Sequence, residues 1–280
     1  MNNSAQSVKD RLKNVAREKD IEFNSVMRFY MYDRFIERLS KSNYKDNFIL
    51  KGGFYLSTLF GIDNRSTMDI DTAINKANLD EETVIKMIED IVQIDLEDNV
   101  TYKINRISPI RDEDEYGGLR VTIDFNLDNI HDSFHIDVAT GDPIYPGPKD
   151  YGYKSIISGR TYKVWAYSIE TVLAEKIETI CSKLGTSSRA KDYYDIYLIN
   201  KLYFNKINKD NFRKAADKTF KNRNFNSDLT KCLDILKNNS TLKQNWISYS
   251  RRNNYAKGIE YEDTIKCLEE FIDILVPVAI

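Results

Sequence analysis

The chain has 280 residues, of which 41% are hydrophobic and 30% charged, and its formal net charge is −2. This balance is typical of a soluble globular protein that buries a core, in one large domain or two modest ones. Three widely spaced cysteines and two histidines, with no C-x-x-C pair, argue against a disulfide framework and against a zinc site.

Neither end of the chain predicts contact with a membrane. Residues 1–7 lack a basic region followed by an apolar one, so no secretory signal is expected. The apolar stretch 271–280 contains Asp273 and Pro277 and is too short to span a bilayer. We therefore expect a cytoplasmic protein with no membrane partner.

The first elements in chain order are two helices within residues 5–42. Apolar residues recur at helical spacing, first over 8–16 and again over 26–39. Residues 1–46 are therefore predicted to form an N-terminal helical segment.

After these helices the pattern changes to short strands and turns. One helix, 81–94, interrupts strands predicted at 48–50, 68–74, 101–104, 119–127 and 134–139. A segment rich in proline and glycine, 141–148, is expected to lead out of the sheet, and the chain from Ser168 onward is predominantly helical in pattern. The sequence predicts a mixed α/β core over 47–160 and a C-terminal helical domain over 161–280.

The most informative feature is a glycine pair, Gly52-Gly53, followed by the motif Met68-Asp69-Ile70-Asp71. Because strand side chains alternate, Asp69 and Asp71 should point from one face and share one patch. Two unit charges about 4 Å apart repel by roughly 4 kcal/mol at a protein surface, and Mg²⁺ with substrate phosphates is the usual counter-charge. The glycines would form a turn that a phosphate can approach. Each half alone could also be a plain turn or a solvated strand edge.

A third acid is expected beside this pair. Asp137 lies between apolar residues in 134–138, on a strand that should be buried. A buried acid is rarely unpaired, so Asp137 is expected to reach the metal patch. Asp124 on the preceding strand is the rival for this role, and a carboxylate bonded to a neighbouring turn is the structural alternative for Asp137.

The helix that begins near Ser168 is predicted to place a lysine on its buried face. At about 100° per residue, Lys176 falls near the centre of an arc of five apolar residues, Val172, Leu173, Ile177, Ile180 and Leu184. Its neighbour Glu175 lies off this stripe and is expected to be solvated. An anionic substrate would satisfy Lys176, and a snorkelling stem is the alternative.

An inward-facing acid follows on the next helix. Asp192 shares a stripe with Asp195, Ile196 and Ile199. The alternative is an acid that serves the N-terminal end of the helix dipole. A pair between Asp192 and Lys176 would explain both buried charges.

The last feature is a basic stretch. Residues 201–260 carry 14 Lys and Arg against 5 Asp and Glu, a surplus of +9 that leaves −11 on the remainder. An acidic half and a basic half suit a protein that handles a polyanion. A solvated, lysine-rich helical surface is the alternative, and the interleaved aromatic residues are expected to be core.

These motifs together resemble the AbiEii-type nucleotidyltransferase toxins over about residues 8–205. The residues that carry the resemblance stand in the expected order: Lys51-Gly52-Gly53, Arg65 to Asp71, Ile136-Asp137-Val138 with Gly141-Asp142, Tyr167 to Glu170 with Ala174-Glu175-Lys176, and Ser188 to Asp195. Such proteins are similar in their core to the DNA polymerase β superfamily. They are the toxins of type IV toxin–antitoxin pairs in abortive infection against phage.

The resemblance implies roles for individual residues. Gly52 and Gly53 would form the turn for the triphosphate, with Arg65 as a further phosphate contact. Asp69 and Asp71 would bind the metal. The family's essential lysine and aspartate match one residue each on the two helices described above, Lys176 and Asp192. The wider superfamily often has serine at the position of Gly53, so backbone N–H groups would have to replace a hydroxyl contact here.

We therefore predict an α+β protein with a polymerase-β-like nucleotidyltransferase sheet, an N-terminal helical segment and a C-terminal helical domain. Mg²⁺ held by Asp69, Asp71 and Asp137 would act on an NTP, with GTP and the pyrimidine nucleotides as candidates. The expected acceptor is the 3′ end of tRNA, and the expected antitoxin acts without stable direct binding. Transfer to a protein hydroxyl and non-catalytic nucleotide or RNA binding are the alternatives.

Overall fold

The computed structural model describes residues 4–74, 80–110, 118–184 and 189–276. It divides into two compact units, Met1–Asp142 with Pro148–Ala166, and Pro143–Gly147 with Tyr167–Ile280. The expected boundary between residues 160 and 161 falls within a hairpin of the first unit, because the strand that begins at Thr161 pairs within that unit's sheet.

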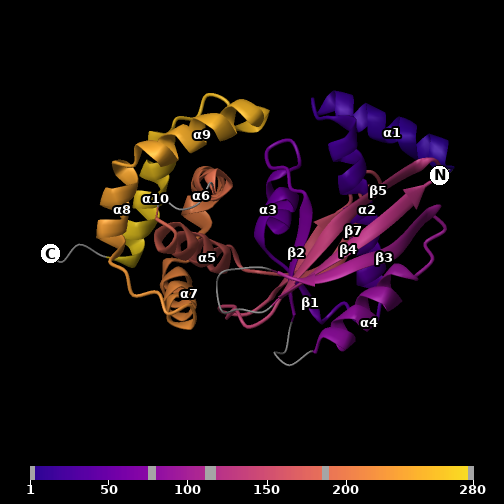
Figure 1. Cartoon of the computed structure of the whole chain (residues 1–280), viewed down its shortest axis with the longest axis horizontal. Helices are drawn as coiled ribbons and strands as arrows, with labels where there is room; N and C mark the ends of the chain where they lie inside the picture. The colour runs from indigo at the N-terminus through magenta and orange to yellow at the C-terminus, as the bar shows by residue number, and fades with distance from the viewer. Residues whose placement is uncertain (1–3, 75–79, 111–117, 185–188, 277–280) are drawn as a thin grey trace. The chain divides into compact units, whose positions relative to one another are not determined.

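The first unit contains a mixed sheet of seven strands in the order β3-β4-β5-β2-β1-β7-β6 (Figure 1). The strands are β1 (Phe48–Leu50), β2 (Asp69–Ile74), β3 (Val100–Pro109), β4 (Gly118–Leu127), β5 (Ile130–Ala139), β6 (Lys149–Lys154) and β7 (Thr161–Ala166). Strand β2 runs parallel to β5 and antiparallel to β1, and β1 runs parallel to β7. The predicted mixed sheet and α+β class are confirmed.

The last two strands correct one expectation. The segment 141–148 was expected to end the sheet. Two further strands of the same sheet, β6 and β7, follow it. Four of the six residues of β6, an edge strand, are exposed, so the apolar alternation on which the sequence prediction depended is weak there.

The helices of the first unit pack around an aromatic core. They are α1 (Ala5–Glu18), α2 (Phe23–Lys41), α3 (Gly52–Phe60) and α4 (Glu81–Val92). The buried ring of Tyr32 on α2 makes edge contacts with Phe54 of α3 at 5.6 Å and with Phe134 of β5 at 5.2 Å between ring centroids. Such pairs add to the stability gained from the buried area. This core fixes α3 beside β2, where the candidate acids lie.

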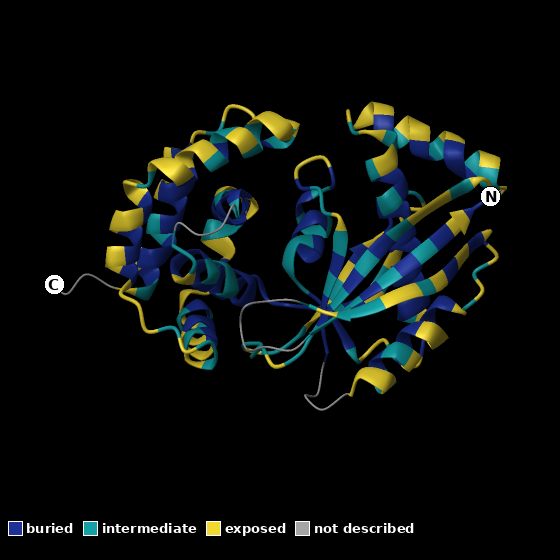
Figure 2. Cartoon of the chain, in the orientation of Figure 1, coloured by how far each residue is buried: buried dark blue, intermediate teal, exposed yellow. Residues whose placement is uncertain are grey.

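The second unit is helical, as predicted for the chain after Ser168. Its helices are α5 (Ile169–Ser182), α6 (Ala190–Tyr203), α7 (Lys209–Asn222), α8 (Leu229–Lys237), α9 (Ser240–Arg252) and α10 (Tyr261–Leu275), with short 3-10 turns η1 (Phe204–Lys206) and η2 (Asn254–Ala256). Side chains at four helix starts, Ser168, Asn208, Asp228 and Asn239, accept a hydrogen bond from the backbone of the first turn. Figure 2 shows α5 and α6 largely buried. Among the described residues, no helix is long and apolar enough to cross a membrane.

Candidate active site

The two acids of β2 lie on the same face of their strand. Asp69 and Asp71 are half-buried, whereas Ile70 between them is fully buried. The side chain of Asp69 keeps 30% of its surface exposed. The spacing therefore predicted their geometry correctly, because side chains at i and i+2 share one face of a strand.

The glycine pair and the acid motif form one structural unit. The N–H of Phe54, in the first turn of α3, donates a hydrogen bond to Asp71 Oδ2 at 3.1 Å, and the N–H of Lys51 donates to the Asp71 carbonyl at 3.0 Å. Gly52 has φ +56°, and a Cβ built there would lie 2.7 Å from Asp71 Oδ2. Both the left-handed backbone and the close approach of the carboxylate require glycine.

Arg65 lies over the second glycine. A Cβ on Gly53 would meet Arg65 Nη2 at 2.8 Å and Thr67 Oγ1 at 3.4 Å. The arginine is only 4% exposed, and its guanidinium donates to the carbonyl of Ser66. Arg65 therefore places a positive charge beside the first turn of α3, as a phosphate contact would require. That role remains a prediction.

The sheet register brings Asp137 next to the acid pair. Asp137 of β5 stands opposite Asp71 of β2 in the parallel pair. The rival acid, Asp124, stands opposite Ser133 instead and accepts a hydrogen bond from Asn105 at 2.7 Å. Because Ser133 precedes Asp137 by four strand residues, Asp124 lies about 13 Å along the sheet from the pair.

Asp137 has a partner that sequence reasoning missed. Arg120 of β4 stands opposite Asp137 and bonds both carboxylate oxygens, Nε to Oδ1 at 2.7 Å and Nη2 to Oδ2 at 2.6 Å. The same Nη2 lies 4.0 Å from Asp69 Oδ2. The hydrogen bond to Asp137 and the charges of the nearby acids raise the pKa of Arg120 above its ordinary value. Both oxygens of Asp137 are thus engaged by protein.

A second charged pair flanks the start of α3. Lys51 Nζ lies 3.0 Å from Asp142 Oδ2, and the two side chains keep only 11% and 8% of their surface exposed. No group of three or more His, Cys, Asp and Glu side chains arranged to hold a metal occurs within the described part of the chain. The β2 acids can therefore supply two ligands, and a complete metal site would need oxygens from a substrate.

The second unit contains the predicted buried lysine. Lys176 Nζ on α5 lies 2.7 Å from Asp192 Oδ1 and 2.7 Å from Asp195 Oδ2; both aspartates are buried, and the lysine side chain is 11% exposed. Burial alone would lower the pKa of Lys176, but the two carboxylates outweigh it and raise the pKa above its ordinary value. The predicted Lys176–Asp192 pair is present, and Asp195 is a second partner that the sequence reasoning did not assign.

Asp192 also lies in the first turn of α6, where an acid favours the helix dipole. Among the residues that the structure describes, its buried Oδ2 has no hydrogen-bond partner. Arg189 Nη1 is 3.8 Å from that oxygen, too far for a hydrogen bond. A buried oxygen in this state is a candidate acceptor for a ligand or a water.

The expectation for Glu175 was wrong. Its side chain is only 14% exposed, and Arg223 of α7 lies 4.0 Å from its carboxylate. The same arginine binds Glu178 at 2.8 Å. Helix α5 packs against α6, α7 and α8, so residues off its apolar stripe are covered as well. The prediction assumed that α5 has a single buried face, whereas neighbouring helices cover more than one of its faces.

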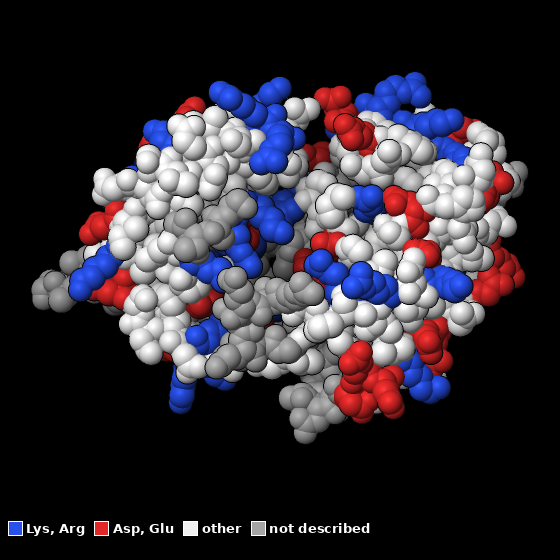
Figure 3. All heavy atoms as spheres, viewed as in Figure 1, with Lys and Arg blue, Asp and Glu red and all other residues white. Residues whose placement is uncertain are grey.

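The basic stretch 201–260 is partly used inside the second unit. Arg213 pairs with Asp210, Lys237 with Glu269 and Lys243 with Glu262. In contrast, Arg251 and Arg252 in the last turn of α9 are exposed, where Figure 3 shows Lys and Arg side chains gathered. The aromatic residues Phe212 and Trp246 are buried, as expected for core.

Two solved structures share this fold, and one of them is a nucleotidyltransferase toxin. JHP933 from Helicobacter pylori matches with a TM-score of 0.54 and 16% identity, covering 91% of this chain and 92% of that one. MenT4, a nucleotidyltransferase toxin from Mycobacterium tuberculosis, matches with a TM-score of 0.52 and 13% identity, covering 94% of this chain and 98% of that one. No protein with a curated description matches in sequence.

The mixed sheet with two alternating acids beside a glycine-initiated helix thus has the nucleotidyltransferase fold. Residues 34–266 match the family model described as nucleotidyl transferase AbiEii toxin of a type IV toxin–antitoxin system. The chain belongs to this family of nucleotidyltransferase toxins.

Proposed function

We propose that this nucleotidyltransferase moves a nucleotide from an NTP to an acceptor hydroxyl, with Mg²⁺ held by Asp69 and Asp71. The observation that carries the proposal is the acid pair on β2, whose second member accepts a hydrogen bond from the first turn of α3. A helix N-terminus attracts phosphate through its amides and its dipole. A triphosphate placed there beside two carboxylates would need a divalent cation.

The donor set fits this metal. Mg²⁺ prefers hard oxygen ligands and is commonly held by one or two carboxylates plus substrate phosphates. When bound, it would neutralise the triphosphate and favour attack by the acceptor hydroxyl. Asp69 and Asp71 supply the carboxylates, whereas both oxygens of Asp137 are held by Arg120. We therefore propose that Asp137 binds the metal only when Arg120 no longer pairs with it.

The protein's own residues would carry the rest of the reaction. The first-turn amides of α3 other than that of Phe54, together with the buried guanidinium of Arg65, would bind phosphate oxygens. Asp71, fixed by the N–H of Phe54, would keep its orientation while substrates exchange. Arg120 would balance the negative charge of the three acids.

Lys176 and Asp192 are proposed as further catalytic residues, Lys176 to neutralise phosphate charge and Asp192 to orient the substrate. The Oδ2 of Asp192, which accepts no hydrogen bond from the described residues, supports a role in binding. Two carboxylates share the charge of Lys176, so a phosphate would have to compete with them.

We further propose that the acceptor is the 3′ end of tRNA, and that the toxin acts in defence against phage under an antitoxin that does not bind it stably. The exposed basic end of α9 supports an RNA acceptor. Transfer to a protein hydroxyl is the alternative that the same chemistry allows.

The test is a labelling experiment. The protein is incubated with each α-³²P-labelled NTP and Mg²⁺, separately with total tRNA and with a cell lysate, and the labelled product is identified. We expect label on tRNA with one preferred nucleotide, and no label in EDTA. Label on protein would replace the tRNA acceptor by the alternative, and no label on any polymer would contradict transfer itself.

Variants locate the activity. Asp69→Asn and Asp71→Asn should abolish transfer while the fold stays intact or becomes slightly more stable, because like-charge repulsion is relieved. The matched control is Asp124→Asn, which changes the same group on the same sheet away from the pair. Full activity in both β2 variants would refute the metal assignment.

A further inference from the structure

A cavity of about 240 Å³ lies in the first unit, apart from the candidate acids. Helices α1 and α2 line it, together with the segment before β3 and the connection between β6 and β7. Tyr162 of β7 lines it, four residues before Ala166, which pairs with Leu50 next to the glycine pair. At about 3.3 Å per strand residue, the two sites are roughly 13 Å apart along the strand.

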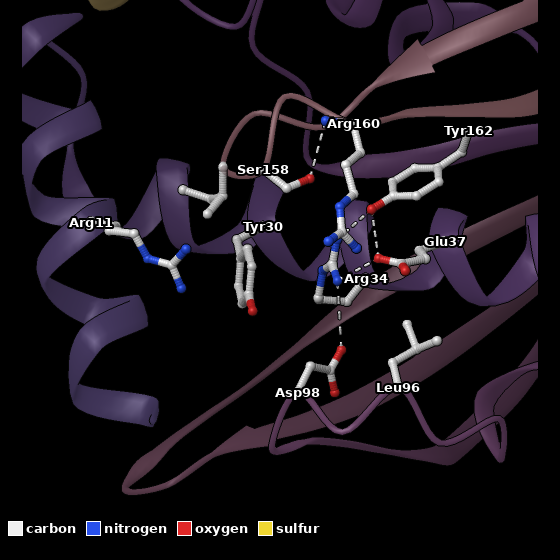
Figure 4. A pocket seen from close by; sticks show the side chains of 10 residues that line it. Arg11, Tyr30, Arg34, Glu37, Leu96, Asp98, Ser158, Arg160 and Tyr162 are labelled. Carbon is white, nitrogen blue, oxygen red and sulfur yellow. Dashed lines mark hydrogen bonds and ion pairs between the residues drawn. The ribbon is translucent and has the colours of Figure 1, made fainter. Parts of the chain in front are cut away.

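Arginine side chains dominate this cavity. Arg34 on α2 and Arg160 before β7 both point into it, as Figure 4 shows, and Arg11 of α1 also lines it. Arg34 is 8% exposed. It forms ion pairs with Glu37 at 2.6 Å and, more distantly, with Asp98 at 4.0 Å, and it donates a hydrogen bond to the hydroxyl of Tyr162 at 3.3 Å.

The acids of the cavity are already shared with other cations. Asp98 is bound by Arg38 through two hydrogen bonds of 2.9 and 3.0 Å. Glu37 also pairs with Lys41 at 2.9 Å. The carboxylates of Glu37 and Asp98 are therefore shared by three cations, Arg34, Arg38 and Lys41. The other arginines of the cavity add further positive charge.

Arg160 has no such partner. Among the described residues, no carboxylate lies within salt-bridge distance of its side chain, and the buried Nε of Arg34 lacks a hydrogen-bond partner. Arg160 is exposed to solvent, whereas Arg34 is only 8% exposed, and an anion bound between the two guanidinium groups would relieve their mutual repulsion. The hydroxyl of Ser158 lines the same space and can donate as well, whereas the hydroxyl of Tyr162 already donates to Glu37 at 2.6 Å.

We propose that this cavity is a second binding site, for the phosphate group of a free small molecule. Guanidinium groups bind phosphate oxygens in pairs, which gives both charge and geometry. The volume is below the usual range for drug-sized ligands, about 300–1,000 Å³, and fits inorganic phosphate or pyrophosphate. The proposal does not depend on the transferase reaction, because it uses none of the residues assigned to it.

The test is isothermal titration calorimetry at low ionic strength, without divalent cations, using inorganic phosphate, pyrophosphate and a nucleoside triphosphate as separate probes. The central variant is Arg160→Gln, which breaks no ion pair and should fold normally. Lys163→Gln is the matched control, since it removes an exposed charge on β7 that does not line the cavity. Asp71→Asn separates this site from the candidate active site.

We expect saturable binding of pyrophosphate or phosphate by the wild-type protein, weakened roughly tenfold or more in Arg160→Gln, as for the loss of a charge-assisted hydrogen bond. Lys163→Gln and Asp71→Asn should bind as wild type does. The ligand should also raise the thermal midpoint of the wild type more than that of Arg160→Gln. If the wild type binds only the nucleoside triphosphate, and Arg160→Gln does not bind it, the site is supported and its ligand is a nucleotide. No saturable binding, or equal binding by Arg160→Gln, would overturn the proposal.

Discussion

Replacement of Gly52 by alanine tests whether the glycine pair exists to admit Asp71. The new Cβ would lie 2.7 Å from Asp71 Oδ2 and 2.8 Å from its Cγ, which is closer than real Cβ contacts. The carboxylate would have to move away, and its hydrogen bond from the N–H of Phe54 would be lost or lengthened. The backbone at this position, with φ +56°, would also be strained by any side chain.

Two terms set the expected magnitude. A left-handed backbone costs an alanine about 1–2 kcal/mol, and losing a hydrogen bond to a charged acceptor costs about 1.5–3 kcal/mol. Gly52→Ala should therefore lower the free energy of unfolding by about 2.5–5 kcal/mol. Gly159→Ala is the matched control, because Gly159 has φ +66° and no atom within 4 Å of the added Cβ. It should lose only the backbone term, about 1–2 kcal/mol.

The assays are urea unfolding for both variants and the labelled-NTP assay under conditions where both are folded. An acid displaced by about 1 Å can lower a rate by roughly 100-fold, so Gly52→Ala should lose transfer and Gly159→Ala should keep it. Equal unfolding free energies for the two variants would refute the contact with Asp71. Equal activities would refute the importance of its position.

Three further predictions follow from charged side chains. Lys176→Ala and Asp192→Ala should each lose transfer, and the double change should cost little more, because residues that act as a unit are not additive; simple additivity would show that they act separately. Burial raises the pKa of Asp33 to about 6 from 3.8, so its ionisation destabilises the fold as pH rises from 4 to 6. Unfolding of Asp33→Asn and wild type should then diverge by about 3 kcal/mol between pH 3.5 and 7, in favour of the variant at the higher pH; a constant difference would contradict the shift. Changing Arg251 and Arg252 to Glu should weaken binding of tRNA and flatten its dependence on log salt, with NTP binding unchanged; an unaltered salt slope would assign them to a solvated face.

Much of the site follows from short-range patterns. The period of two in a strand puts Asp69 and Asp71 on one face wherever the strand lies. The period of about 3.6 in a helix likewise places Lys176 inward. The pairing of Lys176 with Asp192 could also be predicted, because two inward charges of opposite sign on helices close in sequence have few other ways to be satisfied. These predictions need no knowledge of distant contacts.

The strands β6 and β7 could not be predicted in the same way. The residues of β6 are largely polar and exposed, and β7 has two exposed residues, Thr161 and Lys163, so period-two alternation is faint in β6 and short in β7. Their place depends on β7 pairing with β1, more than 100 residues earlier in the chain. The prediction that Glu175 is solvated was wrong for a related reason. Helices α6 to α8 cover positions on α5 that would be exposed on an isolated helix. In both cases a long-range contact decided the outcome.

Arg120 is different, because the sequence contained enough to find it. Strands β4 and β5 are joined by a tight turn at Asp128 and Asn129, so Leu127 must pair with Ile130 and the register continues outward residue by residue. Seven residues before Leu127 on β4 and seven after Ile130 on β5, this counting places Arg120 opposite Asp137. A basic residue in register with a buried acid satisfies that acid without any metal. The conclusion that Asp137 reaches a metal followed from burial alone, and the hairpin register gives it a protein partner first. A metal ion and Arg120 would therefore compete for the same two oxygens of Asp137. The proposed role of Asp69 and Asp71 is the same whether Asp137 binds the metal or Arg120.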